Sequence, residues 1–240
     1  MKVIYAYSIM DIKQIYDLGF DTILGTLTIE QLDELSKYNM KCIYSGSYIE
    51  HDNIISYYLY DEPDVNNINI EEQDIRIAEF RSKTTKPLSI ALIEPITIKC
   101  SQNFDWYLMD IYYSSKLSKL KNYLNIAISS QFLKIQYPNK VILPILGLYD
   151  DNLDFKYSTE ITKFATKFKT YFKGNNHVVF LWNNSIGFFN GVANTKEYQD
   201  YSKELNSKNN KYAISNYFWY PLAWVFLKIN NLLGKRGITI

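Results

Sequence analysis

A regular alternation of two kinds of segment constrains this chain more than any single motif does. Short apolar runs of the length of buried strands are separated by amphipathic segments with the 3.6-residue period of a helix. The strand-like runs are residues 2–7, 20–26, 40–47, 54–64, 87–95, 105–115, 140–151 and 177–184. The helix-like segments are residues 9–19, 29–39, 69–84, 116–139, 158–175 and 195–208. The pattern predicts eight strands, most of them followed by a helix.

Most of these strand-like runs are continuously apolar, which is typical of parallel strands that helices cover. Eight such strands in a chain of 240 residues match the size of a TIM barrel, for which about 250 residues are usual. A doubly wound open sheet is the alternative. A nucleotide-binding sheet of that kind has a glycine-rich first turn, whereas residues 6–11, AYSIMD, contain no glycine. We therefore predict an α/β fold, a (β/α)8 TIM barrel, over residues 1–210.

Capping signals support individual helices of this scheme. Thr28 and Gln31 form a capping-box pattern, and Gly19 is a stop signal at the end of the first helix. The helices after strands three and five are expected to be short or missing, because only residues 48–53 and 97–104 are available for them.

Residues 217–233, YFWYPLAWVFLKINNLL, are the most apolar segment of the chain. About 20 mostly apolar residues are needed to span a bilayer, and this stretch contains Pro221 and Lys228, so we do not expect a transmembrane helix. We predict that residues 211–240 form a helical extension whose hydrophobic helix packs on the barrel. The alternative is that residues 217–233 dock on a membrane surface or on a partner, helped by a short basic tail.

Charge and composition exclude several classes of function. The formal net charge of +1, from 26 basic and 25 acidic residues, leaves no electrostatic footprint for nucleic acid. With 47% hydrophobic residues the chain can bury a large core, as a soluble globular protein does. Cys42 and Cys100 lie in unlike contexts and indicate reduced thiols rather than a disulfide or a zinc site. The first residues lack the pattern of a secretory signal, so a cytoplasmic location is the default expectation.

The strand ends should carry any chemistry, because all strands of a TIM barrel end at one mouth. At or beside these ends the sequence places acids, aromatic residues and an amide: Tyr7, Tyr44, Tyr60, Asp61, Glu62, Glu94, Asp110, Tyr112, Asp150, Trp182 and Asn183. Paired carboxylates can protonate a glycosidic oxygen and stabilise a sugar cation, and aromatic faces stack on sugar rings. The set therefore predicts a carbohydrate substrate.

Within this set we assign Glu62, Asp61 and Asp110 to catalysis. The remaining residues are assigned to substrate binding: Trp182, Tyr7, Tyr44, Tyr60, Tyr112, Glu94, Asp150 and Asn183. We expect no metal and no cofactor, because a chain with two histidines cannot build a three-histidine site and no phosphate-binding loop follows the last strands. The alternative is a Mg²⁺ or Ca²⁺ held by Asp150, Asp151 and Asp154.

The segment YYLYDEPD, residues 57–64, resembles the Y-x-x-x-DEPD signature of TIM-barrel glycoside hydrolase-like proteins, and its adjacent Asp-Glu pair resembles hexosaminidase-type families. Resemblance to the hexosaminidases implies substrate-assisted catalysis, with Glu62 as general acid and Asp61 orienting a 2-acetamido group. Resemblance to the broader retaining barrels implies Glu62 as acid/base and a carboxylate from a later strand as nucleophile. The chain departs from the latter pattern, because strand seven ends in LGLYDD without a Glu.

Side chains alternate between the two faces of a strand, and this alternation indicates which acids point into the barrel. On strand four Glu62 shares an inward face with Ser56, Tyr58 and Tyr60. Asp110, in the middle of the run YLMDIYY, would be buried without a partner unless it lined a cavity. Two functions remain open, a glycoside hydrolase using these carboxylates and a barrel that binds carbohydrate or serves as a scaffold without catalysis.

Overall fold

The computed structural model describes residues 1–6, 11–93, 100–112, 118–148, 158–172, 176–180, 192–207, 219, 221–225 and 228–229. The strands are β1 (Lys2–Tyr5), β2 (Thr22–Gly25), β3 (Lys41–Tyr44), β4 (Ile54–Tyr60), β5 (Leu88–Leu92), β6 (Trp106–Asp110), β7 (Val141–Gly147) and β8 (His177–Phe180). The helices are α1 (Ile12–Asp17), α2 (Ile29–Leu35), α3 (Ile70–Arg81), α4 (Lys119–Gln136), α5 (Ser158–Lys169) and α6 (Lys196–Ser207).

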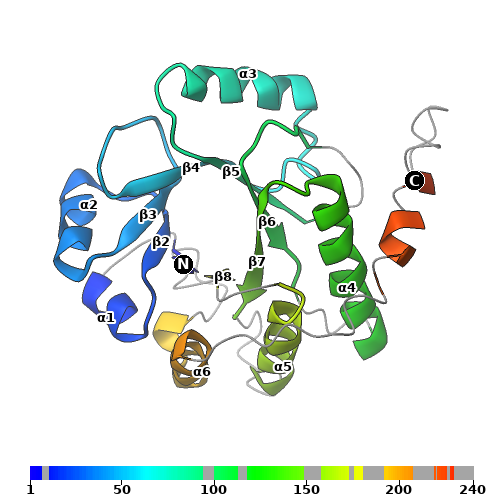
Figure 1. Ribbon diagram of the computed structural model, residues 1–240. Coiled ribbons are helices and arrows are strands. Elements are labelled where there is room, and N and C mark those ends of the chain that lie inside the picture. Colours follow the sequence, from blue (N-terminus) through cyan, green and yellow to red (C-terminus); the bar gives the residue numbers. More distant parts are fainter. Residues whose placement is uncertain are drawn as a thin grey trace.

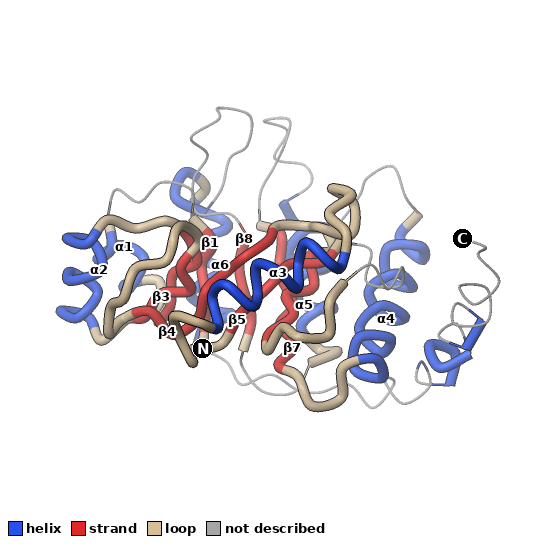
Figure 2. Tube along the Cα trace, turned by 90° about the horizontal axis from the view of Figure 1, so that it is seen from above, coloured by secondary structure: helices blue, strands red, loops and turns tan. Residues whose placement is uncertain are grey.

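The eight strands form one closed barrel. Each strand pairs in parallel with its neighbours in chain order, and β8 closes on β1 through the register that joins Lys2 to His177. Figure 1 looks down this ring, with α1 to α6 arranged around it. Figure 2 shows the strands side by side between the surrounding helices. The predicted TIM-like α/β barrel is therefore confirmed at the level of strand number, order and direction.

Two apolar layers hold the barrel together, one inside the ring of strands and one between the strands and the helices. Alternate strand residues fill the interior: Val3, Tyr5, Leu24, Ile43, Tyr58, Ala91, Leu108, Leu143, Ile145 and Val178. Their neighbours along the strands, such as Ile4, Ile23 and Cys42, belong to the larger outer layer that the helices cover. Because side chains alternate across a strand, a continuously apolar run supplies both layers at once.

Local capping agrees with the sequence. The Thr28 hydroxyl accepts a hydrogen bond from the Gln31 N–H at 3.3 Å, and the Gln31 side chain accepts one from the Thr28 N–H at 3.0 Å. Gly19 has a φ of +83°, which L-amino acids with a side chain rarely adopt, so it can end the first helix. Both predicted signals are confirmed.

No helix lies between β3 and β4, as the short connection predicts. Residues 45–53 form a loop whose side chains Tyr48 and Ile49 pack against the outer layer. The Asn53 amide closes the loop by donating to the Leu32 carbonyl at 2.8 Å. In the second short connection, residues 94–99 lie outside the described part, and residues 100–104 form no helix.

Gly25 at the end of β2 is expected to be intolerant of any side chain. A Cβ at this position would lie 2.4 Å from the Ala6 carbonyl oxygen. Because that oxygen is a backbone atom, no change of side-chain rotamer can relieve the clash. We therefore expect Gly25→Ala to destabilise the fold by about 1–3 kcal/mol, the usual cost of overpacking. The urea concentration at the midpoint of unfolding measures this effect. A midpoint equal to that of the wild type would contradict the prediction.

The C-terminal segment is described only in part. Residues 221–225 are helical, and Ala223 packs against Phe132 of α4. Larger apolar side chains there are half exposed: Leu222, Trp224, Val225 and Ile229. Of the helices that can be described, none combines the length and the apolar character needed to cross a bilayer. The predicted packing of residues 211–240 and the possible membrane contact of residues 217–233 both stay predictions.

Candidate functional site

Two strand ends bring three acids together at the mouth of the barrel. Asp61 and Glu62 follow β4 directly, and Asp110 is the last residue of β6. One carboxylate oxygen from each residue lies within 4.8 Å of the other two. The closed parallel topology produces this approach, because it places the carboxyl ends of all strands at the same mouth. We refer to Asp61, Glu62 and Asp110 as the acid cluster.

The backbone at Glu62 explains how two adjacent residues can both face Asp110. Successive strand residues point to opposite sides, so an Asp-Glu pair on a regular strand would diverge. Glu62 instead has a φ of +48°, in the left-handed region that is strained for a residue with a side chain. The turn is fixed by hydrogen bonds from the Asn66 N–H to the Glu62 carbonyl at 3.0 Å and from the Asn66 side-chain amide to the Asp61 carbonyl at 3.1 Å.

Asp110 is the buried member of the acid cluster. It is only 2% exposed, and its Oδ1 is buried without a hydrogen-bond partner among the described atoms. Burial raises the pKa of the Asp110 carboxyl well above its ordinary value, and the negative charges of Glu62 and Asp61 raise it further, while a hydrogen bond from Tyr112 acts in the opposite direction. The predicted burial of Asp110 is confirmed, but the side chain is not without a partner, because it interacts with Tyr112 and Glu62.

Glu62 is partly buried and its pKa is also raised, first by burial and then by the charge of Asp61. One oxygen of Glu62 lies within 4.8 Å of one of Asp110, and the interaction between the two side chains favours the ionised form of Glu62 and the neutral form of Asp110. Two interacting carboxyl groups of this kind titrate as a pair, with one proton held between them over a range of pH. Such a pair offers a proton donor and a carboxylate in the same place.

Aromatic side chains form the wall beneath the acid cluster. The Tyr58 hydroxyl donates to Asp61 Oδ1 at 2.5 Å, and burial together with the Asp61 charge raises the pKa of Tyr58 well above its ordinary value. The Tyr58 ring packs edge-on against Tyr5, with 6.1 Å between the ring centres, and the centres of the Tyr5 and Phe180 rings lie 5.2 Å apart. Phe180 in turn stacks on Tyr112 at 5.4 Å. The aromatic wall therefore consists of Tyr5 of β1, Tyr58 of β4, Phe180 of β8 and Tyr112, which follows β6.

Three of these aromatic residues were missed by the sequence prediction of the site. Tyr58 lies within β4. Tyr5 and Phe180 are the last residues of β1 and β8, but both fall inside the longer strands that the sequence predicted, residues 2–7 and 177–184. A signal was present, because alternation along strand four places Tyr58 on the inward face. Tyr112, which was predicted, does lie beside the acid cluster.

Two predicted substrate-binding residues lie elsewhere. Tyr60 packs in the outer layer, where its hydroxyl donates to the Glu72 carbonyl of α3 at 3.3 Å. Tyr44 belongs to the same outer layer. The predicted inward face of Tyr60 is wrong, because the pairing of β4 with β5 shifts register between Tyr58 and Tyr60 and interrupts the alternation. The other predicted residues lie outside the described part: Tyr7, Glu94, Asp150, Trp182 and Asn183.

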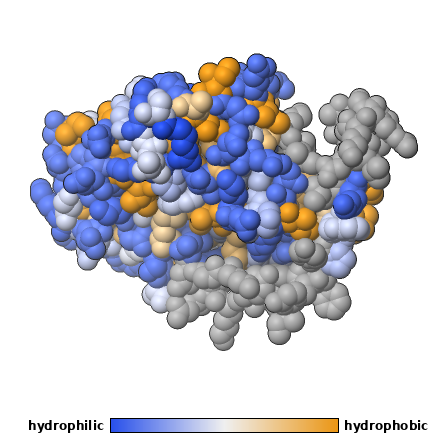
Figure 3. Space-filling view, turned by 45° about the horizontal axis from the view of Figure 1, so that its top comes forward, coloured by the Kyte–Doolittle hydropathy of each residue, from blue (hydrophilic) through white to orange (hydrophobic). Residues whose placement is uncertain are grey.

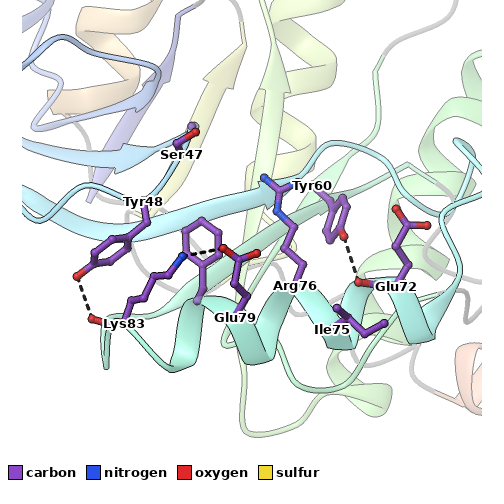
Figure 4. Close-up of a pocket in the computed structure, with 10 residues that line it drawn as sticks. Ser47, Tyr48, Tyr60, Glu72, Ile75, Arg76, Glu79 and Lys83 are labelled. Carbon is purple, nitrogen blue, oxygen red and sulfur yellow. Dashed lines mark hydrogen bonds and ion pairs between the residues drawn. The ribbon is translucent and has the colours of Figure 1, made fainter.

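A groove of about 550 Å³ lies on the outside of the barrel, where α3 faces the loop between β3 and β4. Figure 4 shows that some of its polar groups bond to one another. Lys83 pairs with Glu79 at 2.7 Å, and the Tyr48 hydroxyl donates to the Lys83 carbonyl at 2.9 Å. The Arg76 guanidinium lies 5.0 Å from the centre of the Tyr60 ring. These contacts leave the groove without a net charge. Its residues pack α3 against the loop between β3 and β4, where no helix forms.

The acid cluster is also the one group of three or more His, Cys, Asp or Glu side chains, within the described ranges, whose spacing could hold a metal ion. Its three ligands would all be carboxylate oxygens, the type that Mg²⁺ and Ca²⁺ prefer. The alternative cation site through Asp150, Asp151 and Asp154 lies outside the described residues.

Fold and site together define a TIM-like α/β barrel with an acid cluster at its mouth. In comparisons with known proteins no protein-family model matches the chain and no curated protein is significantly similar to it. The resemblance of residues 57–64 to a glycoside hydrolase motif therefore stays an expectation, and the argument for function depends on the geometry of the acid cluster.

Proposed function

We propose that this protein is a glycoside hydrolase that acts by general acid/base catalysis with the acid cluster. The observation that carries the proposal is the pairing of Glu62 with Asp110, two carboxyl groups whose pKa values are both raised and which can hold one proton between them. A glycosidase needs such a pair in opposite protonation states at neutral pH.

Glu62 is assigned as the proton donor, because it is more accessible than Asp110 and can reach a leaving group. Glu62 receives the proton from Asp110, on which the interaction between the two side chains favours the proton at rest. Its proton passes to the glycosidic oxygen as the bond from that oxygen to the anomeric carbon breaks. Asp110 then stabilises or attacks the anomeric carbon, and water, deprotonated by Glu62, completes hydrolysis. The cluster oxygens lie within 4.8 Å of one another, a limit below the about 6.5–9.5 Å that inverting enzymes need for the attacking water, so retention is assigned.

Asp61 and the aromatic wall are assigned supporting roles. The hydrogen bond from Tyr58 fixes the orientation of the Asp61 carboxylate, and the Asp61 charge favours the protonated state of Glu62. Tyr112 is placed to contact a sugar next to Asp110. Tyr7, Glu94, Asp150, Trp182 and Asn183 stay predicted as substrate-binding residues of the same mouth.

A barrel that binds carbohydrate without hydrolysing it is the second candidate, favoured by the near-complete burial of Asp110, which is 2% exposed. The test is hydrolysis of a panel of aryl glycosides, 2-acetamido sugars included, and of natural oligosaccharides by the wild type and by Glu62→Gln. Hydrolysis that the substitution abolishes supports the enzyme. Sugar binding with no hydrolysis of any member of the panel would instead support the binding barrel.

The proposal makes a prediction about pH. The Asp61 charge is one of the causes that raise the pKa of Glu62, so removing it in Asp61→Asn lowers that pKa. Because the acid must be protonated to act, activity falls as pH rises through its pKa. We expect the alkaline limb of the kcat/KM profile to move to lower pH in Asp61→Asn, as measured across pH 4–9. If the alkaline limb does not move, the charge of Asp61 has no effect on the pKa of Glu62.

A further inference from the structure

The acid cluster carries negative charge that the described residues do not balance. Every ion pair found in the described part lies elsewhere, on helix surfaces or at the opposite end of the strands, as between Arg81 and Asp105 at the start of β6. Tyr58 donates one hydrogen bond to Asp61, and hydrogen bonds of that kind do not neutralise charge. Asp110 is the buried acid and Asp61 is exposed, so a cationic group can reach the cluster from solvent and neutralise the charge that remains there.

A second observation, independent of the clustering, indicates where the ligand binds. Asp110 Oδ1 is buried and has no hydrogen-bond partner among the described atoms, although the residue is only 2% exposed. A buried acceptor without a partner costs about 1–3 kcal/mol, which a donor on a ligand would recover. The ligand group must therefore be a donor, and the neighbouring charges favour one that is positively charged.

We propose that the substrate is an amino sugar with a free, protonated amine, and that its ammonium group binds among Asp61, Glu62 and Asp110. This inference rests on the proposed function, since it names the substrate class of the same site. It differs from the neutral 2-acetamido substrates that the resemblance to hexosaminidases implies.

An ammonium and a bare metal ion require different spacings of the acid oxygens. An ammonium donates along tetrahedral directions over about 2.8 Å, which sets its acceptor oxygens about 4.6 Å apart. Mg²⁺ and Ca²⁺ bind oxygens at about 2.0–2.6 Å, which draws neighbouring ligands to within about 3–4 Å of one another. The cluster oxygens lie within 4.8 Å of one another, a limit that admits both arrangements, so the neighbouring aromatic rings, which a metal ion would not use, favour the ammonium.

The aromatic wall supplies the rest of an amino-sugar site. The rings of Tyr58 and Tyr5 belong to the buried interior directly below the acids, and Tyr112 stacks on Phe180 beside Asp110. The negative face of a ring attracts a nearby cation, and the same face packs against the C–H groups of a sugar. Tyr58 and Tyr5 are buried and can act on the ammonium only from beneath it, whereas the partly exposed Tyr112 can also contact the sugar. A metal ion uses the acids alone.

The test compares three series of aryl glycosides that differ only at carbon 2, where they carry an amine, an acetamide or a hydroxyl, in gluco and galacto configurations. Binding is measured by calorimetry and hydrolysis by release of the aryl alcohol. We expect the amine to bind at least about tenfold more tightly than its acetamide and hydroxyl analogues in one configuration, with a preference that weakens as salt rises. Asp61→Asn should reduce that preference by about tenfold, and the matched control Glu71→Gln, on the exposed start of α3, should leave it unchanged.

Each outcome separates this inference from the proposed function. Hydrolysis of neutral sugars with no preference for the amine would overturn the inference and keep the glycosidase. Tight binding of the amine without hydrolysis would uphold the inference and overturn the glycosidase. A calorimetric titration with Ca²⁺, Mg²⁺ and Mn²⁺ completes the design, because metal binding that Asp110→Asn abolishes, with no amine preference, would replace the ammonium site by a metal site.

Discussion

Glu62→Gln is expected to lower kcat for natural oligosaccharides and for glycosides with poor leaving groups by about 10²–10⁴-fold, the usual contribution of a general acid. Glutamine preserves the shape and the hydrogen-bonding reach of the side chain but cannot supply the proton. The loss should be much smaller for dinitrophenyl glycosides, because a leaving group of low pKa departs without protonation. This dependence on the leaving group identifies the role of Glu62 rather than only its importance.

The control for this experiment is Glu71→Gln, an exposed glutamate on α3 that lies in no cluster. Its kinetics should match those of the wild type, and both variants should melt within a few degrees of it. A uniform loss across all leaving groups would assign Glu62 to substrate binding. Undiminished activity would remove it from the mechanism.

The sequence was sufficient to predict the barrel because the information that defines it is local. Runs of apolar residues, the capping box of Thr28 with Gln31 and the stop at Gly19 each act over a few residues, and the structure confirms them. The closed topology then follows from repetition, since eight parallel strands with helices between them have few other ways to cover both faces.

The candidate site was predicted less completely, for two physical reasons. The left-handed backbone at Glu62, which lets Asp61 and Glu62 converge on Asp110, has no signature in the identity of the residue. The register shift between Tyr58 and Tyr60 broke the alternation that would have placed both rings inside, so Tyr60 was assigned to the wrong layer. Asp110 was identified because an acid inside an apolar strand is unusual enough to be informative alone.

Asp110→Asn should raise stability while it lowers activity. The wild-type carboxyl is 2% exposed and its pKa is raised in the folded state, so folding favours its protonated form. Its contribution to stability is therefore fully present below the unfolded pKa near pH 4 and is lost as pH rises toward the raised value. Asparagine never ionises and avoids this loss. We expect the variant to be more stable than the wild type by about 1–3 kcal/mol at pH 7.5, with the difference shrinking toward zero near pH 4.

Urea denaturation at several pH values measures this difference. The kcat of the same preparations should fall by about 10²-fold or more, because asparagine can neither exchange a proton with Glu62 nor act on the anomeric carbon as a carboxylate. Asp105→Asn is the matched control at the opposite end of β6. That carboxylate pairs with Arg81 and accepts from the Leu88 N–H at 2.8 Å, so its removal should destabilise the fold. If Asp110→Asn also destabilises the fold, Asp110 has a structural role. A catalytic acid is instead expected to lower stability, so that its removal raises it. Opposite signs at the two ends of one strand would instead locate function at the mouth of the barrel and stability at its base.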